Sequence, residues 1–173
     1  MQQAGEQLRD GLYEDAIETL TAVLALSPGD LEALRGRGVA YAQLKQWNLA
    51  VADLGVAKGA APDDVDTWIN WANSLAMANQ VYEAIQAFET LVARQPRCLR
   101  AHLELGRLHL RLGAIPKGRE HLQLALACRP TGAQRQVIVA ILQEQDRLDQ
   151  KRMYRPDFDA LHKQRARQRK RTP

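Results

Sequence analysis

The chain has 173 residues, a formal net charge of +4, 46% hydrophobic residues and only 5% aromatic residues. This length fits one domain or one continuous array, and it can bury a core without a disulfide or a metal. The apolar runs fall far short of the roughly 18 residues that a transmembrane helix needs, which excludes an integral membrane protein.

The charge is uneven along the chain. Residues 151–173 hold nine Lys or Arg against two Asp, whereas residues 1–150 hold fifteen against eighteen Asp or Glu. The N-terminal segment has no basic stretch followed by an apolar one, so we expect no secretory signal. Cys98 and Cys128 form neither a C-x-x-C pair nor a disulfide framework, which predicts a reduced, cytoplasmic setting.

Five columns of similar residues recur every 34 residues. The first is proline, two are apolar, and two are small. In chain order they are Pro28, Pro62, Pro96 and Pro130; Leu20, Leu54, Phe88 and Leu122; Tyr13, Trp47, Val81 and Ile115; Ala16, Ala50, Ala84 and Gly118; and Gly38, Ala72 and Gly106. Five chemically consistent columns do not align by chance, so the chain is an internal repeat.

Each unit divides into two helices. Apolar residues follow a spacing of three to four, as in residues 12–24 and 103–112, which predicts helices. Small or polar residues interrupt this spacing once per unit, at Gly11, Lys45, Asn79 and Gly113. The prolines end each second helix, and the polar residues that follow can cap the next one, namely Asp30, Asp63 and Asp64. The small columns let the paired helices approach closely.

The pattern changes after Pro130. Residues 131–152 predict one longer helix, with Val137, Ile138 and Leu148 on one side and polar residues on the other. A helical array needs a terminal unit with one polar face, so we interpret this segment as a capping helix. Beyond Pro156 the chain is strongly basic and has almost nothing apolar to bury.

The third unit carries the clearest motif, with Trp68, Trp71-Ala72, Leu75, Tyr82, Ala84-Ile85, Phe88, Leu91 and Pro96. With these residues the chain resembles a tetratricopeptide repeat (TPR) array, whose unit is a 34-residue helix–turn–helix. The resemblance implies an all-α, right-handed superhelical solenoid. It divides the chain into a TPR array at 1–132 (repeats at about 1–30, 31–64, 65–98 and 99–132), a capping helix at 133–154 and a basic tail at 155–173.

Three positions depart from the family pattern. Lys45 and Asn79 stand where the family often has glycine between paired helices. Gly118 stands where alanine is usual, which we expect to weaken the last helix of the array by about 0.5–1 kcal/mol.

No catalytic constellation is visible, so we expect no enzyme, no cofactor and no metal. His102, His109 and Cys98 lie on one predicted helix face, and a metal site can be imagined from them. The histidine columns hold Leu, Trp or Tyr in other units, however, so we interpret both histidines as packing residues. Trp68 and Trp71 likewise occupy core columns.

The resemblance implies that the first helix of each unit lines a concave groove. Carrying the family's groove positions over gives Arg35, Val39, Gln43, Asn70, Asn73, Met77, Arg100, Arg107 and Arg111, with Leu8, Arg9, Glu32, Asp66, Ile69, Leu103 and Leu110 beside them. Asn side chains suit the backbone of an extended peptide, because they both donate and accept. Arginines suit carboxylates, so we expect the late groove to prefer an acidic ligand.

TPR co-chaperones grip the C-terminal carboxylates of heat-shock chaperones with a five-residue clamp of basic and Asn residues. Arg35, Asn70 and Arg100 fit that clamp, whereas Val39 and Glu104 stand where Asn and a basic residue are wanted. A glutamate there would repel the ligand carboxylate, so we reject the complete clamp.

The expected function is a non-enzymatic, cytoplasmic protein–protein interaction module, an adaptor, scaffold or co-chaperone-like protein that binds a partner's extended or helical segment. Two alternatives stay open. One is a nucleic-acid, ribonucleoprotein or anionic-surface accessory that uses the basic tail, through Lys163, Arg165, Arg167, Arg169, Lys170 and Arg171. The other is the regulatory domain of a larger enzyme.

Overall fold

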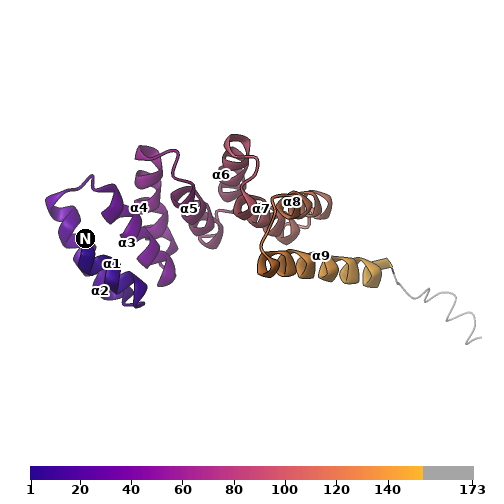
Figure 1. Ribbon diagram of the computed structural model, residues 1–173, viewed down its shortest axis with the longest axis horizontal. Helices are drawn as coiled ribbons and strands as arrows, with labels where there is room; N and C mark the ends of the chain where they lie inside the picture. The colour runs from indigo at the N-terminus through magenta and orange to yellow at the C-terminus, as the bar shows by residue number, and fades with distance from the viewer. Residues whose placement is uncertain (154–173) are drawn as a thin grey trace, which may run out of the picture. The chain divides into compact units, whose positions relative to one another are not determined.

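The computed structural model describes residues 1–153, and no strand occurs among them. Residues 1–131 form one compact unit, and a second begins at residue 132. The first unit holds helices in chain order (Figure 1): α1 (Gln2–Arg9), α2 (Tyr13–Leu26), α3 (Leu31–Gln43), α4 (Trp47–Ala60), α5 (Val65–Met77), α6 (Val81–Arg94), α7 (Leu99–Arg111) and α8 (Ile115–Ala127). The all-α fold expected from the repeat is confirmed.

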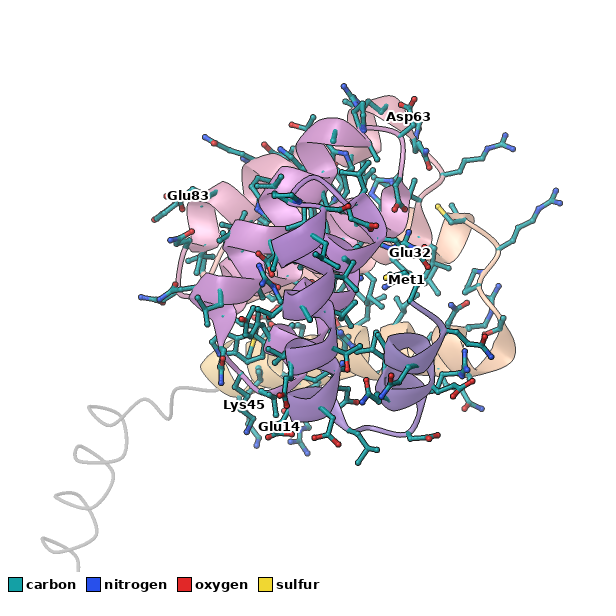
Figure 2. All side chains as sticks on the ribbon, turned by 90° about the vertical axis from the view of Figure 1, so that its left-hand side faces the viewer. Met1, Glu14, Glu32, Lys45, Asp63 and Glu83 are labelled. Atoms are coloured by element: carbon teal, nitrogen blue, oxygen red, sulfur yellow. The ribbon has the colours of Figure 1, made fainter. Side chains whose placement is uncertain are left out.

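The first helices of the pairs form an inner layer. Each helix of the first unit packs against the next, and α1 also contacts α3, α3 contacts α5 and α5 contacts α7. Successive second helices are not in such contact, so the layer made by α1, α3, α5 and α7 is the more closely spaced one. Figure 2 shows Lys45, which lies in a turn within a pair, and Asp63, which lies between pairs, at opposite edges of this unit.

Every pair turns through the same backbone motif. The turn residue has a positive φ of 77° at Gly11, 60° at Lys45, 67° at Asn79 and 76° at Gly113. The next N–H then donates to the carbonyl five residues earlier, as from Gln46 to Tyr41 at 2.8 Å. The interruptions in the sequence pattern therefore mark the turns. Lys45 adopts a conformation that costs a residue with a side chain about 1–2 kcal/mol.

Carboxylates cap two of the inner helices. Asp30 accepts a hydrogen bond from the N–H of Ala33 at 2.9 Å, and Asp64 accepts from the first turn of α5. Both caps were expected from the sequence, whereas Asp63 is not the N-cap of α5. α7 begins at Cys98 without a side-chain cap.

The small columns allow close contact between paired helices. A Cβ placed on Gly38 would lie 2.6 Å from Leu54 Cγ, and one on Gly106 would lie 2.7 Å from Leu122 Cγ. The expectation that Gly118 merely weakens its helix needs correction. A Cβ there would lie 2.7 Å from Leu110 Cγ and 3.1 Å from the carbonyl oxygen of Gly106, so this glycine lets α8 approach α7.

The large apolar column fills the core of the first unit. Leu20, Leu54, Phe88 and Leu122 are fully buried. Trp68 is also buried, as its column predicts, and its indole N–H donates to the carbonyl of Pro62 at 2.8 Å. Trp71 is half-buried and meets Trp68 edge to face, with ring centroids 6.1 Å apart.

One long helix follows the array. α9 (Gly132–Met153) has 22 residues, and its role as a cap and the boundaries 133–154 stay predictions. The basic tail at 155–173 lies outside the described residues. Within the described part of the chain, no helix combines the length and apolarity needed to cross a membrane.

Candidate functional site

Three adjoining hollows run along the inner layer of helices. The first, of about 360 Å³, opens between α1 and α3, where Met1 and Glu32 lie close together (Figure 2). It shares Val39 and Asn70 with a second hollow of about 230 Å³. The second shares Asn73 and Met77 with a third hollow of about 320 Å³ between α5 and α7. Together these hollows, which we call the groove, extend from α1 to α7.

Most residues that the sequence analysis assigned to the groove line these hollows. They are Leu8, Glu32, Arg35, Val39, Asp66 and Asn70 in the first hollow, Gln43, Asn73 and Met77 in the second, and Arg107 and Arg111 in the third. The shared residues therefore come from α3 and α5, the two central helices of the inner layer.

Five expected groove residues line none of the three hollows. Arg9 is exposed and Leu103 is half-buried, and the other three have specific surroundings. Ile69 is 1% exposed and belongs to the core, so its assignment to the groove is wrong. Leu110 packs on Gly118 of α8, because the missing Cβ leaves room for its side chain. Arg100 lines none of the three hollows. Its guanidinium instead lies 2.6 Å from the carboxylate of Asp66.

Each arginine of α3 and α7 already has a partner within the chain. Arg35 donates to the carboxylate of Asp64 at 3.0 Å, and Arg107 donates to Glu104 at 2.9 Å. Arg111 donates to the carbonyl oxygen of Ala76 at 3.3 Å. An acidic ligand would compete with these acceptors, so the arginines are poorer carboxylate sites than their spacing indicated.

Two neighbouring donors, Thr67 first and Arg35 second, stabilise the ionised form of Asp64. A hydrogen bond from the Thr67 hydroxyl, assisted by Arg35, lowers the pKa of the Asp64 carboxyl. Asp64 thus stays ionised at neutral pH, caps α5 and holds Arg35 at the same time. Two of the three clamp-compatible residues, Arg35 and Arg100, are therefore engaged by acidic residues of α5 or its cap.

The centre of the groove carries no charged side chain. Its lining is Val39, Ala42, Gln43, Trp47, Asn70, Asn73, Ser74 and Met77. The hydrogen bonds among the described residues leave the side-chain amides of Gln43, Asn70 and Asn73 without a partner. Free amides beside apolar side chains can bind a peptide backbone while an apolar group of the ligand is buried.

Polar contacts between paired helices were missed by the sequence analysis. The Thr19 hydroxyl of α2 donates to the side chain of Gln7 in α1 at 3.0 Å. Arg37 of α3 makes two hydrogen bonds to the buried carboxylate of Asp53 in α4, at 2.7 and 3.0 Å. His121 of α8 stacks on both His102 and His109 of α7. The available signal was one repeat column, occupied by Thr19, Asp53, Ala87 and His121, in which three residues are polar and one is apolar.

The histidines occupy the packing positions that their columns predicted. His102 and His109 are buried, with 5% and 6% of their surfaces exposed. Within residues 1–153, no three His, Cys, Asp or Glu side chains gather in a way that could hold a metal ion. Lys163, Arg165, Arg167, Arg169, Lys170 and Arg171 lie outside the described residues.

Known proteins resemble this chain in sequence. It is 30% identical over 121 residues to the BBSome complex member BBS4 of Bos taurus, which covers 70% of this chain and 23% of that protein. It is 28% identical over 103 residues to a peroxisomal targeting signal receptor of Eremothecium gossypii, which covers 60% and 18%. The chain thus spans about a fifth of the length of these relatives.

Solved structures share the fold. The structure titled MamA 41-end from Desulfovibrio magneticus RS-1 matches with a TM-score of 0.71 at 24% identity, over 73% of this chain and 72% of that chain. A family model described as tetratricopeptide repeat matches residues 1–65 and 69–133, which together include all four helix pairs except residues 66–68 of α5. The chain therefore belongs to the tetratricopeptide repeat family.

Proposed function

We propose that this chain is a non-enzymatic protein–protein interaction module that binds an extended or helical segment of a partner in the groove. The observation that supports this most directly is the continuity of the three hollows. Adjacent hollows share Val39 and Asn70, then Asn73 and Met77, so one segment can occupy all three.

The lining indicates what kind of segment would bind. The uncharged centre offers three unpartnered amides for backbone groups, and Val39 and Met77 offer apolar surface for a side chain. An isolated charge placed there would lose hydration without gaining an opposite charge. The proposed ligand therefore has a neutral, partly apolar centre.

The ends of the groove differ from its centre. Glu32, Arg35 and Asp66 line the first hollow, and Glu104, Arg107 and Arg111 line the third. Both ends thus contain acidic and basic groups, which can form hydrogen bonds with positively or negatively charged side chains of a ligand. A wholly acidic ligand is not favoured, since it would face Glu32, Asp66 and Glu104.

The names of the relatives agree with a role in binding, because one is a receptor for a targeting signal and the other is a member of a protein complex. This agreement concerns the class of function alone. The proposed partner of the present chain is defined by the groove chemistry.

The test uses the full chain and a phage-displayed library of random peptides of about twelve residues, long enough to follow the groove when extended. We expect enrichment of peptides with an apolar, uncharged centre. The Asn70→Ala/Asn73→Ala variant should bind the enriched peptides about tenfold more weakly, since each lost hydrogen bond is worth about 0.5–1.5 kcal/mol.

A matched control is Gln86→Ala, which removes an exposed amide from α6, a helix outside the inner layer. It should leave peptide affinity within about twofold of the wild type, as expected for an ordinary surface substitution. Failure to enrich any peptide, or equal losses in the groove variant and the control, would contradict the proposal. Thermal unfolding of both variants checks that the fold is intact.

A further inference from the structure

Three histidine rings form a continuous stack between the helices of the last pair. The ring of His121 lies between those of His102 and His109, with centroid distances of 5.5 Å to each. The interplanar angles are 30° with His102 and 3° with His109. We call these three residues the histidine stack. It joins two residues of α7 to one of α8.

The hydrogen bonds of the stack are incompatible with a positive charge on both His102 and His121. Its Nε2 lies 3.0 Å from the carbonyl oxygen of Pro96, which can only accept, so this nitrogen carries the proton. Its Nδ1 lies 3.2 Å from Nδ1 of His121, so one of these two nitrogens donates a hydrogen bond to the other. When both rings are fully protonated, this contact becomes two opposed N–H groups, which breaks the link from α7 to α8.

The third ring also disfavours a charge. Nε2 of His109 is buried and has no hydrogen-bond partner within the described residues. A proton on that nitrogen would create a buried donor without an acceptor, on a cation that has lost its hydration. The neutral ring, by contrast, packs flat against His121.

The surrounding charges do not offset this penalty. Among the described residues, the charged groups that act on the pKa values of His109 and His121 are Glu89 from α6 and Lys117 and Glu120 from α8. Burial is the largest influence and lowers the pKa of both rings. Lys117 lowers the pKa of His109 further, and the neighbouring histidines lower that of His121, against smaller opposing effects of the two glutamates.

We propose that the histidine stack is a pH-sensitive lock that holds α7 against α8 when its rings are neutral and releases them when the rings are protonated. The proposal does not depend on what the groove binds. Because α7 also supplies Arg107 and Arg111 to the third hollow, opening of the lock would alter that end of the groove.

The direction of the pH effect follows from the two states of the chain. An ordinary histidine, as in the unfolded chain, titrates near pH 6.5, and the pKa values of His109 and His121 in the folded chain lie lower. The unfolded state therefore takes up protons first as the pH falls. The stability contributed by the stack is complete above pH 6.5 and is lost as the pH falls through the folded-state pKa values.

Titration of the wild-type chain by NMR, from about pH 8 to about pH 5, tests the proposal without any substitution. We expect the ring signals of His109 and His121 to titrate below pH 6.5. We also expect amide hydrogen exchange in α7 and α8 to accelerate relative to α3 and α4, by up to about tenfold for each pH unit by which a measured ring pKa lies below 6.5.

The variant His109→Leu/His121→Ala places in the last pair the residues that the third unit has at these positions, Leu75 and Ala87. In this variant, acid should no longer accelerate amide hydrogen exchange in α7 and α8 more than in α3 and α4. The control His162→Asn, outside the described residues, should behave as the wild type does. Rings that titrate at or above pH 6.5, or a wild-type chain in which both helix pairs respond equally to acid, would overturn the proposal. So would an unchanged acceleration in the double variant.

Discussion

The second and fourth helix pairs are built on the same repeat but are joined by different polar contacts. In the α3–α4 pair, the carboxylate of Asp53 binds Arg37 through two hydrogen bonds. In the α7–α8 pair, His121 occupies the equivalent position and stacks between two histidines. One column of the repeat thus supports a permanent ion pair in one unit and a cluster of neutral rings in another.

The two contacts differ in how their charge depends on pH. The hydrogen bonds that Arg37 donates to Asp53 raise the pKa of its guanidinium, which stays charged at any physiological pH. Burial lowers the pKa of the His109 and His121 rings, so the neutral form of these two rings is favoured. The second pair is therefore held by a fixed charge pair, and the fourth by groups whose charge changes near neutral pH.

The largest expected effect comes from breaking the ion pair. Asp53→Ala removes a side chain that is 11% exposed and leaves the Arg37 guanidinium with the Thr21 hydroxyl as its remaining hydrogen-bond partner among the described residues. We expect the free energy of unfolding to fall by about 3 kcal/mol, because an uncompensated charge is left between the helices. Urea unfolding followed by circular dichroism measures this loss.

The control is the double variant Arg37→Leu/Asp53→Ala. It introduces the residue types that other units have at the equivalent positions, Leu105 in the fourth unit and Ala87 in the third. It should recover stability to within about 1 kcal/mol of the wild type, because both charges are then gone. A loss below about 0.5 kcal/mol for the single variant, typical of a surface site, would show that the ion pair is unimportant.

A smaller effect is expected at the closest approach of α7 and α8. Gly118→Ala introduces the residue that the other units have in this column, but its Cβ would lie 2.7 Å from Leu110 Cγ. We expect a loss of about 1–2 kcal/mol from overpacking, measured by thermal or urea unfolding.

Gly59→Ala in α4 is the matched control, since nothing lies within 4 Å of a Cβ at that position. It should stabilise the chain by about 0.5–1 kcal/mol through helix propensity alone. If both substitutions stabilised the chain, Gly118 would be an ordinary helical glycine after all.

The smallest expected effect concerns the turns of the same two pairs. Lys45 turns the second pair with a φ of 60°, whereas Gly113 turns the fourth with a φ of 76°. Lys45→Gly should raise the free energy of unfolding by about 0.5–1 kcal/mol, and Gly113→Lys should lower it by a similar amount, because only glycine adopts this conformation without a steric penalty. Thermal unfolding at one pH measures both, and changes of the same sign would contradict this account.

The sequence predicted the groove better than it predicted the partners of the groove residues. Val39, Asn70 and Asn73 lie where the repeat register placed them, because each first helix presents the same face in every unit. Ile69 was misplaced. Although it stands next to Asn70 on the same helix, its own side chain is buried in the core. The engagement of Arg100 by Asp66 joins different helix pairs, and spacing within one unit carries no information about such contacts.

The periodic features of this chain were determined by its sequence alone. The 34-residue columns fix the number of helix pairs, the turns at Gly11, Lys45, Asn79 and Gly113, and the large residues that fill the core, because these depend on local geometry and on which face of a helix is apolar.

Tertiary structure alone decided which polar groups meet. It paired Arg37 with Asp53 and placed His121 between two buried rings. It also showed that Gly118, expected to weaken its helix, makes room for the close approach of α7. Each of these contacts joins different helices, so it depends on the distance and rotation between helix axes. Close packing of whole side chains sets those two quantities, and no local pattern in the sequence encodes them.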